Sequence, residues 1–139
     1  MEKDKEEKAR EMFMEFQAVE QHIKQLQKQL EMITGQLIDL TVTNNSLDEF
    51  SNIDSKKEIF VPLSSGIFTK ANLSGTQELL VNVGANVVVK KDVPSTKKLI
   101  GKQVEEIKKV QRQMIEELEK MTSHAAELEM KIQSVVSGE

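Results

Sequence analysis

Two segments of the chain place hydrophobic residues at alternating steps of four and three positions. The first repeat begins at Met12 and ends at Leu47, and the second begins at Ile100 and ends at Val135. Such a repeat keeps a narrow apolar stripe on one face of a helix and is typical of a coiled coil. Because the two segments have similar lengths and flank a central insert, we expect them to pair with each other. The predicted product is an antiparallel helical hairpin that is roughly 50 Å long at 1.5 Å per residue.

One polar residue interrupts each stripe, Asn44 in the first and Gln111 in the second. A polar residue at such a position either costs a little stability at a tolerant site or specifies the register and direction of the helices. Both interpretations fit the sequence. The stripes themselves are compatible with two registers that differ by one heptad.

Residues 58–92 have a different pattern, in which hydrophobic residues alternate over short runs. The runs lie on either side of two turn-like sequences, residues 64–66 and 84–86, and therefore predict two β-hairpins. Pro62 has no amide donor, which places the first strand at an edge or turns its donor-free side outward. Four short strands cannot cover both of their own faces, and open edges promote uncontrolled pairing. We therefore expect the hairpins to pair with hairpins of other subunits and to close a β-barrel between subunits.

The predicted fold class is α+β, with a long antiparallel coiled-coil hairpin and two central β-hairpins. Residues 1–52 form the N-terminal coiled-coil helix, residues 58–92 form the oligomerisation platform, and residues 94–137 form the C-terminal coiled-coil helix. Asp92 and Pro94 suit the cap and the first turn of that second helix. The predicted oligomer interface consists of apolar strand residues: Ile59, Val61, Leu63, Ile67, Leu79, Val81, Val83, Val87, Val88 and Val89.

Composition narrows the classes of function. The 139 residues are 30% charged and 4% aromatic, they include no cysteine, and the net charge is -4. Charges of both signs are mixed along the helices, so neither a basic surface for nucleic acid nor a disulfide framework is present. The first residues lack the apolar core of a signal peptide, and no apolar run has the length of a membrane span. We expect a soluble, cytoplasmic protein with neither nucleic acid nor a membrane among its partners.

Candidate catalytic groups are scarce. The sequence contains no phosphate-binding Gly-Lys loop, no nucleophile elbow and no reactive cysteine, so we expect no enzymatic activity and no cofactor. His22 and His124 flank the stripes at equivalent heptad positions, but a metal site needs at least three protein ligands. We therefore expect two solvated histidines and no metal.

The strand segment carries a resemblance to a known family. Its hairpin sequences FVPLSSGIFTKANL and ELLVNVGANVVVKK, set between two coiled-coil arms, resemble the α-class subunit of archaeal-type prefoldin. The β-class subunits of that family have one hairpin in this place, so two hairpins favour the α class. The resemblance implies a hexamer of two α and four β subunits, with a double β-barrel body and six coiled-coil tentacles. It also implies ATP-independent capture of non-native polypeptides and their delivery to a group II chaperonin.

Apolar residues near the helix ends away from the insert exceed what the stripes require. Methionine suits contact with varied clients because its side chain is unbranched and polarizable. Ordinary core residues together with scattered surface apolar residues would give the same pattern. The predicted client-binding tip consists of Met12, Phe13, Met14, Phe16, Val19, Leu128, Met130, Ile132, Val135 and Val136.

Two further interpretations stay open. Met32, Ile38, Val110 and Ile115 also lie off the stripes around mid-shaft, where they form a second patch or widen the packing face. The same coiled coil would also serve a structural or adaptor subunit of another multiprotein complex. Suppression of the aggregation of several unrelated unfolded proteins would distinguish a chaperone from both of those roles.

Overall fold

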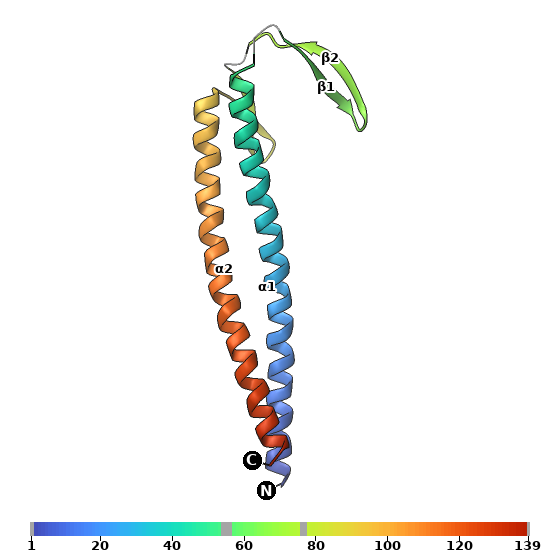
Figure 1. Ribbon diagram of the computed structural model, residues 1–139, viewed down its shortest axis with the longest axis vertical. Coiled ribbons are helices and arrows are strands. Elements are labelled where there is room, and N and C mark those ends of the chain that lie inside the picture. Colours follow the sequence, from blue (N-terminus) through green and yellow to red (C-terminus); the bar gives the residue numbers. More distant parts are fainter. Residues whose placement is uncertain (1, 54–56, 76–77, 139) are drawn as a thin grey trace. The chain divides into compact units, whose positions relative to one another are not determined.

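The computed structural model describes residues 2–53, 57–75 and 78–138 (Figure 1). Residue 1 of the predicted N-terminal helix and residues 76–77 of the predicted platform lie outside this part. Two long helices flank two antiparallel hairpins, which confirms the predicted α+β fold class. The elements are α1 (Glu2–Ser51), β1 (Glu58–Ser64), β2 (Ile67–Asn72), β3 (Leu79–Gly84), β4 (Val87–Lys91) and α2 (Val93–Val136).

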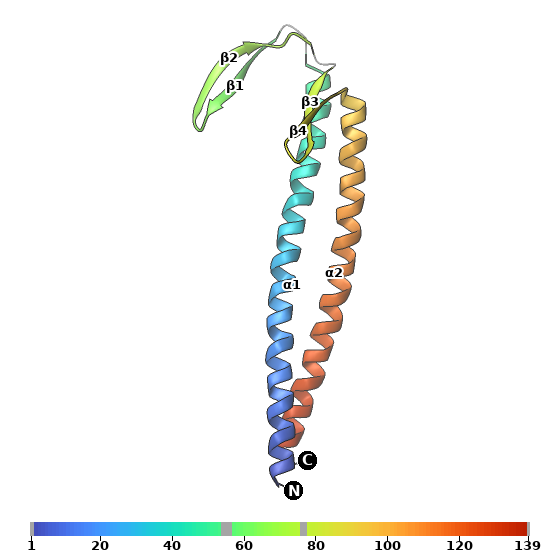
Figure 2. The same ribbon diagram turned by 180° about the vertical axis from the view of Figure 1, so that it is seen from behind.

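The chain divides into two compact units. We call residues 1–36 and 107–139 the helical unit, and residues 37–106 the hairpin unit. In the helical unit, the segments of α1 and α2 lie side by side, and both chain ends lie at the same end of the unit (Figure 1 and Figure 2). Every stripe residue of this unit is buried or half-buried, and Val19, Leu26 and Leu128 are the most buried. The four-three repeat explains this burial, because it places these side chains on the faces along which the two helices meet.

Polar pairs on the flanks of the stripes fix the register of the helical unit. His22 Nε2 lies 3.2 Å from Glu117 Oε1, and His124 Nε2 lies 3.1 Å from Glu15 Oε1. The second pair is one heptad away from the first along each helix. A slip by one heptad in one direction would place His22 opposite His124, and a slip in the other direction would place Glu15 opposite Glu117. These pairs therefore select one of the two registers that the stripes allow.

The two polar stripe residues have different surroundings. Gln111 Nε2 donates a hydrogen bond to Thr34 Oγ1 across the helical unit at 3.2 Å. This bond favours the interpretation that Gln111 helps to specify the register. In the hairpin unit, the buried Oδ1 atom of Asn44 has no hydrogen-bond partner among the described residues. Because an unpaired buried acceptor is destabilising, Asn44 lowers the stability of its own layer.

Each β-hairpin forms a separate two-stranded antiparallel sheet (Figure 2). Val61 lies opposite Thr69 in the first hairpin, and Val81 lies opposite Val89 in the second. The register shifts close to each turn, between Pro62 and Ser64 in β1 and between Asn82 and Gly84 in β3. An extra residue at such a bulge increases the local twist of the ladder.

The two hairpin turns depend on residues with positive φ angles. Gly66 has φ 79° in the first turn, and Ala85 and Asn86 have φ 50° and 62° in the second. Positive φ at both central residues defines a type I′ turn, whose twist matches that of the flanking strands. Asparagine tolerates this conformation well, whereas the Cβ atom of Ala85 makes it cost roughly 1–2 kcal/mol.

The start of α2 is capped as the sequence predicts. Asp92 Oδ1 accepts a hydrogen bond from the Ser95 N–H at 2.8 Å, and Pro94 lies in the first turn. The buried hydroxyl of Thr96 donates to the Asp92 carbonyl oxygen at 2.7 Å. Hydrogen bonds from the Ser95 side chain, and then from its backbone N–H, lower the pKa of the Asp92 carboxyl. These contacts fix the point at which β4 ends and the helix begins.

Candidate functional site

The first candidate site is the hairpin β1–β2, which is apolar on both faces. Phe68 lies opposite Pro62, and Phe60 lies two residues before Pro62, so these three side chains share one face. Phe60 and Phe68 are 66% and 60% exposed. Val61 and Leu63 directly follow Phe60 and Pro62 on β1, and both are also exposed. A two-stranded ribbon with two exposed apolar faces is marginal in water and needs covering by another chain.

The hairpin β3–β4 is apolar on both faces but is unevenly exposed. Val81 and Val89, which lie opposite each other, are half-buried. On the other face, Leu80 is 72% exposed and Val88 is 53% exposed. The face that carries Leu80 and Val88 is therefore the more available of the two for contact with another chain.

The predicted interface residues all lie in the four strands, and each is exposed or half-buried. Sequence reasoning missed three exposed residues, Phe60, Phe68 and Leu80, because it followed alternate positions on β1, β2 and β3 and included consecutive residues only on β4. Consecutive apolar residues, such as the Leu79-Leu80 pair, were the signal that both faces are apolar. The participation of all these residues in an oligomer interface stays a prediction.

The second candidate site is the end of the helical unit where the two chain termini lie. Four large apolar side chains of the predicted tip are exposed there: Phe13 by 50%, Met14 by 63%, Met130 by 72% and Val136 by 75%. They come from both helices, α1 and α2. This surface is rich in methionine and adaptable, as expected for contacts with varied apolar partners.

The remaining residues of the predicted tip are less accessible. Met12, Phe16, Ile132 and Val135 are half-buried. Val19 and Leu128 are buried, with 8% and 4% exposure, and belong to the contact between the helices. These two residues would reach a client only if the helix ends separated.

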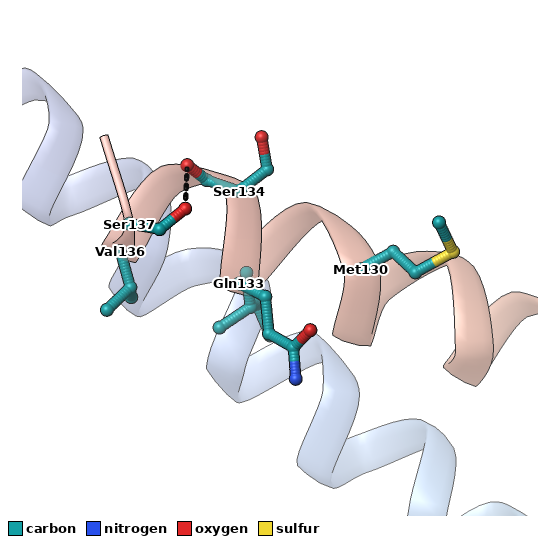
Figure 3. A pocket seen from close by; sticks show the side chains of 6 residues that line it. Met130, Gln133, Ser134, Val136 and Ser137 are labelled. Atoms are coloured by element: carbon teal, nitrogen blue, oxygen red, sulfur yellow. Dashed lines mark hydrogen bonds between the residues drawn. The ribbon is translucent and has the colours of Figure 1, made fainter. Parts of the chain in front are cut away.

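A shallow hollow lies at the end of α2. Its lining includes Met130, Ile132, Gln133 and Val136, and the Gln133 side chain lies between Met130 and Val136 (Figure 3). The Ser137 hydroxyl donates a hydrogen bond to the Ser134 carbonyl oxygen at 3.4 Å. The hollow is formed by helix-end side chains and opens to solvent, so it suits loose apolar contact better than the enclosure of a small ligand.

These geometries can be set beside known proteins. The family model described as "Prefoldin subunit" matches residues 19–138, which include α1 from Val19 onward, both hairpins and all of α2. The chain belongs to the prefoldin family. This finding confirms the resemblance that the hairpin sequences carry.

Named relatives place this prefoldin chain with the archaeal α-class subunits. The prefoldin subunit alpha of Methanobrevibacter smithii is 33% identical over 82 residues, which is 59% of this chain and 56% of that relative. The prefoldin subunit alpha of Thermofilum pendens is 24% identical over 119 residues, which is 86% of this chain and 92% of that relative. A chain of the filamentous PFD from Methanocaldococcus jannaschii, solved by cryo-EM, superposes with a TM-score of 0.65 and 16% identity. That superposition covers 94% of this chain and 99% of the other, and it supports the fold.

Other features of this prefoldin chain bear on its chemistry. Within residues 2–53, 57–75 and 78–138, no three histidine or acidic side chains are grouped as metal ligands. His22 and His124 are each paired with a glutamate. No helix in the described part of the chain has both the length and the hydrophobicity that a membrane span requires.

The mid-shaft residues Met32, Ile38, Val110 and Ile115 are exposed by 40–68%, and Val42 is exposed by 57%.

Proposed function

We propose that this prefoldin chain is a subunit of an ATP-independent holdase of the cytoplasm. Its helix end binds exposed apolar segments of non-native polypeptides and keeps them from aggregating. Its two β-hairpins join it to β-class prefoldin subunits, in a hexamer of two α and four β subunits. The complex then passes the bound polypeptide to a group II chaperonin.

The exposed apolar side chains at the helix end carry the proposal for client binding. Phe13, Met14, Met130 and Val136 are each at least half exposed, although a stable helix pair does not require them at the surface. A passive tether would gain nothing from such residues at a free end. An unfolded polypeptide, in contrast, offers apolar segments that these side chains can cover.

The exposed hairpins support the proposal for assembly. Each hairpin is an isolated two-stranded sheet with exposed apolar residues, such as Phe60 in the first and Leu80 in the second. Pairing with hairpins of other subunits would satisfy the open strand edges and bury these side chains. Membership of the prefoldin family supports β-class subunits as the partners and a group II chaperonin as the acceptor.

Weak binding by each arm is compatible with release in the absence of a nucleotide. Covering ~200 Å² of apolar surface at one helix end gives at most about 5 kcal/mol at ~25 cal/mol per Å². Ordering the flexible client and the side chains reduces this value further. Several arms that hold one polypeptide make the later contacts intramolecular and raise the overall affinity. Each arm can still detach individually, so a chaperonin can compete for the client.

The test is the suppression of aggregation by the assembled complex. Several unrelated proteins are denatured and diluted into buffer with or without the complex of this chain and a β-class subunit, and light scattering is recorded. We expect the complex to reduce scattering for all of them, without ATP. An adaptor or structural subunit would protect none of them, or only one specific folded partner, and that result would overturn the proposal.

A further inference from the structure

The described methionines of this chain fall into two groups by burial. Those of the first group lie on the stripes and are half-buried: Met12, Met114 and Met121. Those of the second group lie off the stripes, where Met14, Met32 and Met130 are exposed by 63%, 68% and 72%. The helical repeat explains the division, because stripe side chains pack between the two helices and the others face solvent. A reagent dissolved in water therefore reaches the second group first.

Two of the three exposed methionines lie at the helix end, one on each helix. Met14 lies directly before Glu15, Met130 lies six residues after His124, and Glu15 pairs with His124 across the helical unit at 3.1 Å. These two methionines supply half of the four large apolar side chains of the predicted tip that are exposed there. The third exposed methionine, Met32, lies in mid-shaft.

The thioethers are the groups of this chain that oxidise most readily. The sequence contains no cysteine, no tryptophan and no tyrosine. Oxidation to methionine sulfoxide converts a flexible apolar side chain into a polar one, and the change is reversible. A helix end that contacts clients through methionine can therefore be adjusted by oxidation of the atoms that make the contact.

We propose that Met14 and Met130 form a reversible oxidation site for hydrogen peroxide, and that their sulfoxides weaken client binding by this arm. The inference rests on the proposed client-binding function of the helix end. A client segment that covers a sulfoxide removes water from a strongly polar S–O group, and an apolar segment offers it no hydrogen-bond donor in return. Both side chains lie off the stripes, so their oxidation leaves the helix pair and the assembled complex intact.

The chemistry of the site needs peroxide in one direction and thiols in the other. A lone pair of the thioether sulfur attacks one peroxide oxygen, the O–O bond breaks and an S–O bond forms. The departing hydroxide takes up the proton of the transferred oxygen and leaves as water, so sulfur loses two electrons and peroxide gains them. In the reverse direction, two thiols supply two electrons and two protons. The sulfoxide oxygen then leaves as water, and the thiols form a disulfide.

Peptide mapping by mass spectrometry tests the location of the site. The assembled complex of this chain and a β-class subunit is treated with a low dose of hydrogen peroxide for a series of times, quenched and digested. We expect Met14 and Met130 to gain one oxygen at least about threefold faster than Met114 and Met121, because peroxide reaches exposed side chains more easily. Equal rates for the two pairs would overturn the assignment.

A bound client should shield the site from peroxide. The oxidation is repeated on a complex that has captured a denatured client, with capture confirmed in the same sample. We expect the client to slow oxidation of Met14 and Met130 at least about twofold and to leave Met32 unchanged, because only the helix end is covered. Unchanged oxidation at Met14 and Met130 would overturn their role in the contact.

The functional test compares the parent complex with a double variant that carries Met14→Leu and Met130→Leu. Leucine has nearly the volume of methionine but no sulfur to oxidise. Each complex is compared with its own untreated sample, so a difference in starting protection cancels. Oxidation of the β-class subunit cancels as well, because both complexes contain it. We expect peroxide to reduce client protection about twofold more in the parent, with unchanged hexamer content.

Reversal and a matched control complete the experiment. A methionine sulfoxide reductase supplied with a thiol should restore protection by the parent, and a Met32→Leu complex should lose as much protection to peroxide as the parent does. An equal loss in the parent and the double variant, or full protection with Met14 and Met130 completely oxidised, would overturn the oxidation site and leave the proposed function standing. An untreated parent complex that protects no client would overturn the proposed function, and this inference with it.

Discussion

Removing the exposed apolar side chains of the helix end should reduce client protection while leaving assembly intact. The perturbation is a fourfold variant in which Phe13, Met14, Met130 and Val136 are each replaced by serine. These residues are 50–75% exposed, so the contact between the two helices loses little. The strands and the stripe residues are unchanged, and the hexamer should therefore form normally.

The size of the effect follows from the exposed area. If a client covers ~200 Å² of these side chains, the substitutions remove at most about 5 kcal/mol of contact from one arm at ~25 cal/mol per Å². The loss in the hexamer is smaller, because the β-class arms keep their own contacts and avidity depends on how many arms engage. We therefore expect protection to fall several-fold and not to disappear.

The assay is light scattering of a denatured client that is diluted into the intact or variant complex, with hexamer content measured in the same samples. The matched control replaces the four exposed mid-shaft residues, Met32, Ile38, Val110 and Ile115, by serine. Full protection by the helix-end variant together with lost protection by the mid-shaft variant would refute the reasoning. It would assign client binding to the mid-shaft patch.

Three further predictions concern stability and assembly. Replacing Asn44 by leucine should stabilise the folded complex by about 1–3 kcal/mol, because it removes a buried unpaired acceptor, and thermal unfolding would measure the gain. Replacing Asp92 by alanine should lower the melting temperature. Because folding lowers the pKa of Asp92 below its ordinary value of 3.8, its contribution is present above that value and is lost as the pH falls through the lowered pKa. The difference in melting temperature should therefore disappear in acid, and a difference that persists there would contradict this origin. Replacing Val88 by aspartate should prevent hexamer formation in size-exclusion chromatography, because assembly would bury the charge, whereas Ile38→Asp on α1 should not.

The fold could be predicted from sequence because its determinants are local and periodic. The four-three repeat positions the stripe residues, and Asp92 and Pro94 set the start of α2. Residues 84–86 mark the second turn, although an alanine at positive φ, as at Ala85, is not a turn signal that sequence rules anticipate. These features need no knowledge of the rest of the molecule.

The register was less accessible because it depends on residues outside the stripes. The stripes repeat every seven residues, so a slip of one heptad leaves the apolar pairing almost unchanged. The pairs His22–Glu117 and Glu15–His124 distinguish the two choices. Matching histidines with carboxylates at the positions beside the stripe would have found them.

The candidate sites were predicted only in part. The exposed tip residues could be identified because they are apolar but lie outside the stripes. The burial of Val19 and Leu128 required the structure, because sequence periodicity does not show how tightly the two helices pack near their ends. Phe60, Phe68 and Leu80 were missed on the hairpins, since a strand covered by another chain can be apolar on both faces. The partner that covers those faces is not encoded in this chain alone.

Native mass spectrometry of the reconstituted complex, incubated with a denatured client, tests the central claim most directly, because it reports assembly and capture together. We predict one dominant species that contains two copies of this chain, four copies of the β-class subunit and one client polypeptide, and that forms without ATP. A folded monomer of this chain, an assembly that excludes the β-class subunit, or an intact hexamer that leaves every client unbound would contradict the account.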